Sequence, residues 1–227
     1  TAYTLLIMLS SYSVCRAMVM PASFLVVLFY AIYLVVRNGV ISYQKASGLA
    51  MFSGIVIFCF YSFIRLKEML PVEEYGYDAI FFILLILCFA WGGDTCAYFA
   101  GRAFGKHKLC PVVSPKKTVE GAIGGVLGTM VFGVLVTVIY SIAADRMEEF
   151  TRSNIGVSMY VIIALLACVA AVLGIYGDLF ASVVKRQCGI KDYGTIFPGH
   201  GGILDRFDSV MFIAPFVTMV VIAAFYN

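Results

Sequence analysis

The sequence is poor in charged residues for its length. Only 13% of the 227 residues are charged, against about 25% in an average soluble domain, and the mean hydropathy is +0.98. The cysteines are scattered, with no CxxC pair and no Cys/His cluster, which argues against a disulfide framework or a zinc site. Alternating segments of about ten residues, which a transmembrane β-barrel needs, are also lacking. These features exclude an ordinary soluble enzyme and leave a helical membrane protein.

Long apolar runs fill the chain instead, and 62% of its residues are hydrophobic. About 20 apolar residues are needed for a helix to cross the hydrocarbon layer. We therefore predict an all-α, polytopic transmembrane helix bundle with about seven spans. The predicted spans are 2–20, 21–36, 48–64, 78–100, 119–144, 156–184 and 204–226. Because the chain begins at Thr1 and shows no signal-peptide pattern, we also expect the natural N-terminus to be longer.

The loops between these spans differ in charge. Loops 37–47, 102–118 and 185–203 carry ten basic residues and one acid, whereas segments 65–78 and 144–156 carry seven acids. By the positive-inside rule the first set lies in the cytoplasm. We predict N-terminal transmembrane helices over 1–90 and a catalytic transmembrane region over 91–227, with cytoplasmic loops 102–118 and 185–203.

Small residues recur at helical spacing in two spans. The stripes are Gly121 with Gly125, Gly124 with Gly128, and Gly174 with Gly177 and Ala181. Small side chains let helix backbones approach one another, so the stripes predict close helix packing. Approach of the backbone to a ligand is the alternative.

Acidic residues within apolar spans are costly and mark functional sites. Four aspartates, all near the basic loops, qualify: Asp94, Asp178, Asp205 and Asp208. Asp178, Ser182 and Lys185 share one helix face, and so do Asp205 and Asp208. Carboxylates from two helices could hold Mg²⁺ together with substrate phosphates. Alternatively, each aspartate pairs with a nearby lysine or arginine for structural reasons.

Two polar segments are candidates for phosphate binding. In Ser114-Pro-Lys-Lys-Thr-Val-Glu-Gly121 we predict Thr118 as a helix N-cap, with Lys116 and Lys117 near a helix N-terminus that attracts anions. The spacing of a Walker A loop is absent. His200 stands between glycines and could bind phosphate or donate a proton. An ordinary basic loop is the alternative for both segments.

The C-terminal part carries a longer pattern. Residues 182–208 read SVVKRQCGIKDYGTIFPGHGGILDRFD and match every fixed position of SxxKRx4KDxGxxxPxHGGxxDRxD. This resembles the signature of phosphatidate cytidylyltransferases. Residues 91–125 and 174–212 are similar to that family, whereas residues 1–90 contribute only hydropathy.

The resemblance implies transfer of a cytidylyl group from CTP to phosphatidic acid, giving CDP-diacylglycerol and pyrophosphate. It implies Mg²⁺, with K⁺ beside it, membrane lipids as partners, a homodimer, and no nucleic acid. The expected location is a bacterial cytoplasmic (inner) membrane with the active site facing the cytoplasm. The implied catalytic residues are Asp178, Asp205, Asp208, Lys185, Arg186 and His200. The implied substrate-binding residues are Ser114, Lys116, Lys117, Thr118, Ser182, Lys191, Asp192 and Arg206. The implied metal ligands are Asp178, Asp205, Asp208 and Asp94.

Two other functions fit parts of this pattern. A CTP-dependent kinase of lipid alcohols would use the same nucleotide and membrane but release CDP. A transporter or channel could also hold buried aspartates, although it would be expected to show inverted repeats, and the sequence shows none.

Overall fold

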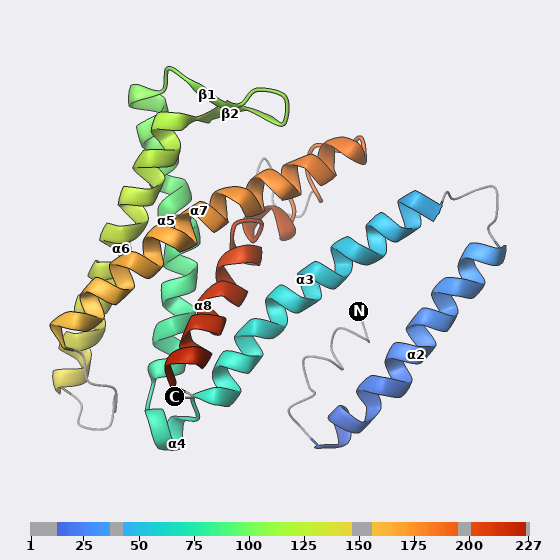
Figure 1. Cartoon of the computed structure of the whole chain (residues 1–227), viewed down its shortest axis with the longest axis horizontal. Coiled ribbons are helices and arrows are strands. Elements are labelled where there is room, and N and C mark those ends of the chain that lie inside the picture. Colours follow the sequence, from blue (N-terminus) through green and yellow to red (C-terminus); the bar gives the residue numbers. More distant parts are fainter. Residues whose placement is uncertain (1–12, 37–42, 147–155, 195–200, 226–227) are drawn as a thin grey trace.

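The structure is a computed structural model that describes residues 13–36, 43–146, 156–194 and 201–225. These residues form long helices, one short hairpin and a single 3-10 turn (Figure 1). The elements are α2 (Ser13–Val36), α3 (Tyr43–Met69), α4 (Val72–Tyr75), α5 (Asp78–Phe104), β1 (Lys108–Cys110), β2 (Ser114–Thr118), α6 (Val119–Arg146), α7 (Val157–Gln187), η1 (Leu204–Arg206) and α8 (Val210–Phe225). The all-α helix bundle predicted from the sequence is confirmed. The hairpin is an addition that hydropathy did not indicate.

Four helical segments within the described residues are long and apolar enough to cross a membrane. They are Ala46–Met69, Asp78–Phe104, Val119–Ala144 and Val157–Gln187. Each matches one of the predicted spans to within a few residues at either end. The protein is therefore an integral membrane protein, although a total of seven spans is not confirmed.

The predicted spans at the two ends of the chain differ from the structure. We predicted a break between residues 20 and 21, but α2 continues through Pro21, and residues 1–12 lie outside the described part. Proline is tolerated inside a transmembrane helix because neighbouring groups can satisfy the freed backbone oxygen. The last span also starts later than predicted, at Val210, because residues 204–206 form the 3-10 turn. Asp205 and Asp208 therefore precede α8 and do not share a helix face.

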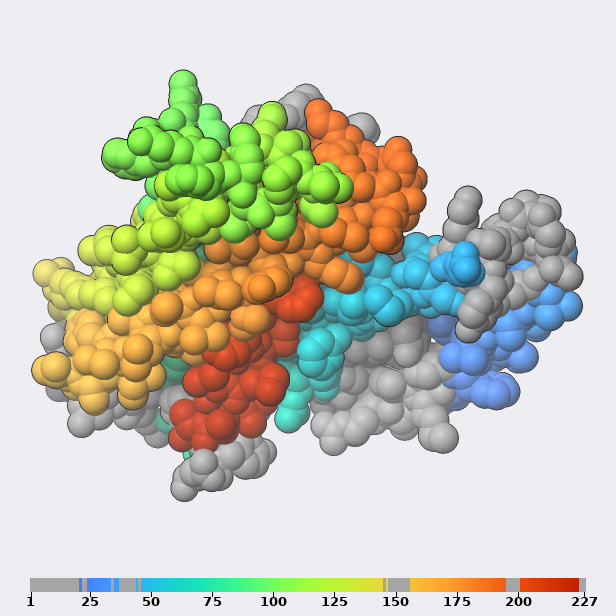
Figure 2. Space-filling view, turned by 45° about the horizontal axis from the view of Figure 1, so that its top comes forward, coloured from blue at the N-terminus to red at the C-terminus, as the bar shows by residue number. Residues whose placement is uncertain are grey.

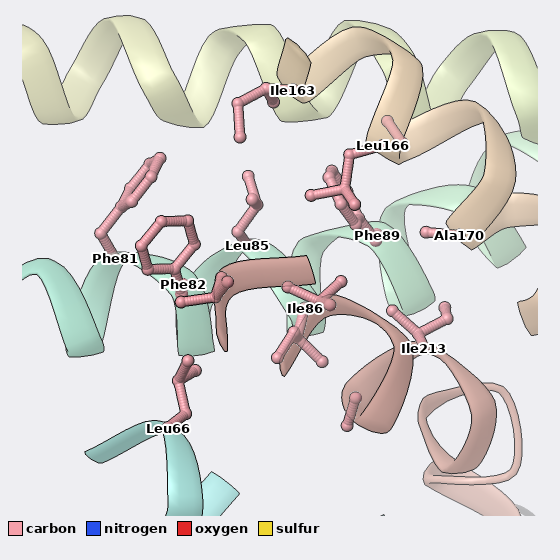
Figure 3. Close-up of a cluster of buried hydrophobic side chains, with 14 of the residues drawn as sticks. Leu66, Phe81, Phe82, Leu85, Ile86, Phe89, Ile163, Leu166, Ala170 and Ile213 are labelled. Atoms are coloured by element: carbon pink, nitrogen blue, oxygen red, sulfur yellow. The ribbon is translucent and has the colours of Figure 1, made fainter. Parts of the chain in front are cut away.

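The larger of two hydrophobic clusters among the described residues joins helices α3, α5, α6, α7 and α8. Phe81, Leu85 and Phe89 of α5 meet Ile163 and Leu166 of α7, with contributions from α3 and α8 (Figure 3). The predicted division at residue 90 falls inside α5, and core side chains come from both sides of it. The two predicted regions share this core, and the placing of catalysis in 91–227 remains a prediction.

Helices α5 and α6 pack closely along the predicted glycine stripe. A Cβ atom on Gly124 would collide with Ala100, and one on Gly128 would collide with Cys96. The predicted close helix contact is confirmed, and it lies within the chain. Gly121, at the start of the same stripe, borders the cavity described below, so the alternative of backbone approach to a ligand also remains open for that glycine.

The basic hairpin lies at a different end of the bundle from the acidic helix α4. The hairpin and the C-terminal end of α7 lie in the upper half of Figure 1, whereas α4, with Glu73 and Glu74, and the C-terminal end of α8 lie in the lower half. The hairpin and the end of α7 belong to the two basic loops predicted to be cytoplasmic. The fold thus gathers these positive segments on the side where α5 ends and α6 begins.

A buried hydrogen bond ties α5 to α6 at the opposite end. Tyr140 Oη donates to Asp78 Oδ1 at 2.6 Å, and the Tyr140 ring stacks on Phe81. Replacing Tyr140 with phenylalanine keeps the ring but removes the donor, so we expect a loss of about 1–3 kcal/mol in unfolding free energy. Thermal unfolding in detergent measures this loss. Tyr33→Phe on α2, where the side chain is 40% exposed, is the matched control, and an equal effect of both changes would contradict the assignment.

Candidate active site

A cavity of about 500 Å³ lies between α5, the start of α6, the hairpin and α7. In Figure 2 the green atoms of the hairpin and the start of α6 lie beside the orange C-terminal part of α7. The polar side chains that line the cavity are Asp94, Tyr98, Arg102, Lys116, Lys117, Thr118, Asp178, Asp205 and Asp208. The fold thus brings carboxylates and basic groups from distant parts of the sequence to one space.

The hairpin places two lysines at the mouth of this cavity. Its antiparallel register pairs Lys108 with Thr118 and Cys110 with Ser114. Thr118 Oγ1 accepts a hydrogen bond from the backbone N–H of Gly121 at 3.1 Å, which confirms the predicted N-cap of α6. Lys116 and Lys117 directly precede Thr118 in the chain. The N-cap hydrogen bond of Thr118 therefore also fixes where the backbone of these two lysines lies.

Glu120 binds the residues that directly precede β1, the other strand of the hairpin. Its carboxylate accepts hydrogen bonds from the backbone N–H groups of Lys106 and His107, and lies 2.6 Å from His107 Nδ1. The sequence alone suggested no partner for His107. Glu120 sits in the first turn of α6, so the residues just before β1 are held at the helix end that follows β2.

Four carboxylates line the cavity, and three of them come from different elements. Asp94 of α5 accepts a hydrogen bond from Ser209 Oγ at 2.9 Å, and Asp178 of α7 forms an ion pair with Lys117. Asp208 comes from the segment before α8. Burial, followed by repulsion from the nearby Asp178 carboxylate, raises the pKa of Asp208 to about 7. Such crowding of negative charge favours a cation among these groups.

Gly177 permits this crowding. A Cβ at that position would lie 2.6 Å from the backbone oxygen of Asp208 and 3.5 Å from Cα of Ser209. The absence of a side chain therefore lets the segment before α8 lie against α7, beside Asp178. The predicted small-residue stripe in α7 thus has a local consequence for the site.

Lys185 and Asp205 form a largely buried ion pair behind these groups. Lys185 Nζ lies 2.9 Å from Asp205 Oδ1 and 3.9 Å from Asp208 Oδ2. Asp205 Oδ2 accepts the backbone N–H groups of Tyr193 at 2.8 Å and Gly202 at 2.9 Å. Burial raises the pKa of Asp205, but the hydrogen bond from Lys185, together with those from the N–H groups of Gly202 and Tyr193, holds this pKa below its usual value. Asp205 therefore links Lys185 of α7 to the backbone of Tyr193 and Gly202.

The carboxylates fit a hard divalent ion in one particular way. Within the described ranges, no three His, Cys, Asp or Glu side chains are placed to hold a metal by themselves. Mg²⁺ in nucleotide sites is often held by one or two carboxylates together with substrate phosphates. Asp94, Asp178 and Asp208 suit that arrangement because all three line the cavity. Asp205 already accepts three hydrogen bonds, and its assignment as a metal ligand stays a prediction.

Comparison with known proteins identifies the family. The family model described as "Cytidylyltransferase family" matches residues 1–224. The chain belongs to this family.

Curated relatives agree with this assignment. The chain is 32% identical over 198 residues to a phosphatidate cytidylyltransferase of Bacillus subtilis, covering 87% of this chain and 66% of that protein. It is 39% and 42% identical over 145 residues to proteins of the same name from Staphylococcus haemolyticus and Staphylococcus epidermidis, covering 64% of this chain and 50% of each relative. The chain thus spans between half and two thirds of the length of these relatives.

Not every residue predicted for this cytidylyltransferase-family site reaches the cavity. Ser182 lies beside it and donates to Asp178 Oδ1 at 3.4 Å. Within the described part of the chain, five further predicted residues are absent from its lining: Ser114, Lys185, Arg186, Lys191 and Asp192. Arg206 is also absent from the lining, and its backbone oxygen accepts a hydrogen bond from Trp91 Nε1 at 3.0 Å. His200 lies outside the described residues, so its predicted role stays a prediction.

Sequence reasoning overlooked several residues of this site. Tyr98 and Arg102 line the cavity, and Glu120 fixes the hairpin. Trp91 is 46% exposed, and its indole N–H donates a hydrogen bond to the backbone oxygen of Arg206 in the 3-10 turn. The spacing of Tyr98 and Arg102, four residues apart near the end of a span, was a signal that could have found them.

Proposed function

We propose that the protein is a phosphatidate cytidylyltransferase that converts CTP and phosphatidic acid into CDP-diacylglycerol and pyrophosphate. One observation carries the proposal: a cavity bordered by membrane-spanning helices contains both aspartates and lysines. A lipid phosphate and a nucleotide triphosphate are both anionic, and only one of them enters from water. The bacterial relatives, which are named phosphatidate cytidylyltransferases, support the same reaction.

The reaction needs orientation and charge neutralisation more than a strong base. A phosphate oxygen of phosphatidic acid attacks the α-phosphorus of CTP, and the bond to the β-phosphate breaks to release pyrophosphate. Because a phosphate monoester is already nucleophilic, the side chains need mainly to bind and align the two substrates. Lys116 and Lys117 line the cavity and would bind phosphate oxygens, while Lys185 forms an ion pair with Asp205.

One or two of the Asp94, Asp178 and Asp208 carboxylates, together with substrate phosphates, would hold the divalent ion, which we propose to be Mg²⁺. Such an ion, when bound, neutralises charge on the phosphate oxygens and the leaving group. The expectations of a K⁺ ion beside it and of a homodimer stay predictions. We also propose that the cavity faces the cytoplasm of a bacterial inner membrane, because the basic loops lie on its side.

The product distinguishes this proposal from its alternatives. Purified protein in detergent, supplied with CTP, Mg²⁺ and phosphatidic acid, is expected to form CDP-diacylglycerol and pyrophosphate, and EDTA is expected to abolish both. Mass spectrometry of the lipid and a pyrophosphate assay measure the products. Release of CDP instead would indicate a lipid kinase, and absence of any nucleotide turnover would contradict an enzyme of either kind.

A further inference from the structure

The basic groups around the cavity differ in the partners they already have. Lys117 forms an ion pair with Asp178, and Lys185 is held by Asp205. Arg102 and Lys116 also line the cavity, and within the described residues neither forms an ion pair with a carboxylate. These two side chains therefore have positive charge available for an anionic ligand.

Arg102 is oriented by a neighbour on its own helix. It lies one helical turn after Tyr98, and its Nη1 donates to the Tyr98 hydroxyl at 3.3 Å. The guanidinium group has five N–H donors in a planar fork that matches two oxygens of a phosphate. One donor bound to Tyr98 leaves the others for a ligand, and the Tyr98 hydroxyl hydrogen remains able to donate as well.

The two available cations lie at different levels relative to the membrane. Arg102 is in the last turn of the span Asp78–Phe104, among exposed aromatic side chains such as Phe99 (62%) and Phe104 (71%). Aromatic residues gather at the level of the lipid headgroups, and arginine reaches that level readily. Lys116, by contrast, lies on the hairpin, beyond the end of that span.

The cavity wall also changes character across this boundary. Ala97 and Ile175 continue the lining into the membrane-spanning parts of α5 and α7, whereas Lys116 and Lys117 form its side toward the hairpin. A lipid phosphate enters with its glycerol and acyl chains still in the apolar layer. A triphosphate enters from the water side.

We propose that Arg102 and Tyr98 form the subsite for the phosphate of the lipid substrate, and that Lys116, the available cation of the hairpin, serves the nucleotide instead. This inference rests on the proposed function and adds to it which side chains distinguish the two substrates. Both ligands carry phosphate, so the subsite is identified by the substrate whose Michaelis constant responds to its loss.

Steady-state kinetics in mixed micelles tests the subsite. The mole fraction of phosphatidic acid is varied at saturating CTP, and CTP is then varied at a saturating lipid fraction. Arg102→Gln is expected to raise KM for phosphatidic acid about tenfold or more, and Tyr98→Phe about threefold, with KM for CTP changed less than twofold. Arg102→Lys keeps the positive charge but loses the planar guanidinium group with its paired donors, so we expect a KM for phosphatidic acid between those of the wild type and Arg102→Gln.

A matched control is available at the other end of the bundle. Arg146, exposed in the last turn of α6, is changed to glutamine and is expected to leave both Michaelis constants unchanged. If Arg102→Gln raises KM for CTP instead, or changes neither constant, the subsite is wrong even though the enzyme is active. If the unchanged protein forms no CDP-diacylglycerol, the proposed function itself fails, and the lipid subsite fails with it.

Discussion

Replacing Asp178 with asparagine is expected to lower kcat on the order of 10³-fold while the protein remains folded. Asp178 lines the cavity, pairs with Lys117 and lies close enough to Asp208 to raise its pKa. A divalent ion at phosphate oxygens supplies several kcal/mol of transition-state stabilisation, and about 1.4 kcal/mol corresponds to a tenfold change in rate. Loss of one carboxylate that would hold the ion therefore has a large effect on the chemical step.

The measurement is turnover at saturating CTP, phosphatidic acid and Mg²⁺, with thermal unfolding recorded on the same samples. Glu73→Gln, which removes an exposed carboxylate on α4, is the matched control and is expected to retain full activity. The apparent affinity for Mg²⁺ in the Asp178→Asn protein is expected to fall as well. Full activity of that variant at ordinary Mg²⁺ concentrations would refute the role of Asp178.

Replacing Lys185 with methionine is expected to lower the unfolding free energy by about 3 kcal/mol or more, because removal of one partner leaves a buried charge without compensation. The Lys185 and Asp205 side chains are 11% and 6% exposed. Since Asp205 also accepts the N–H groups of Tyr193 and Gly202, these two hydrogen bonds are expected to weaken. Thermal unfolding in detergent and amide hydrogen exchange at Tyr193 measure the two effects.

A second variant distinguishes the effect of the lost ion pair from the effect of changed side-chain packing. In the double variant Lys185→Met with Asp205→Asn, the amide oxygen can still accept both backbone N–H groups, and no Asp205 charge remains buried. We therefore expect the double variant to recover much of the stability lost by Lys185→Met alone. Lys67→Met, at an exposed position of α3, is the control for the added methionine. A Lys185→Met protein that unfolds at the wild-type temperature would show that the ion pair of Lys185 with Asp205 does not stabilise the fold.

The membrane-spanning helices could be predicted well because hydropathy is a local property of the chain. Residues 78–104 and 119–146 are apolar over a length that fits the bilayer, and no distant contact is needed to make them helical. The break expected at Pro21 was wrong because a proline can be accommodated within a membrane helix. The early start expected for the last span was also wrong, since the segment 204–209 contains ionisable groups whose partners lie elsewhere in the chain.

The sequence by itself also determined the family, through the long pattern between Ser182 and Asp208. It further determined which aspartates and lysines are candidates for the active site. Only the tertiary structure decided how these groups are used. It pairs Lys117 with Asp178 and Lys185 with Asp205, and leaves Arg102 beside Tyr98 at the cavity wall. The physical reason is that ion pairing and burial depend on distances between segments far apart in the chain, which spacing within one helix does not fix.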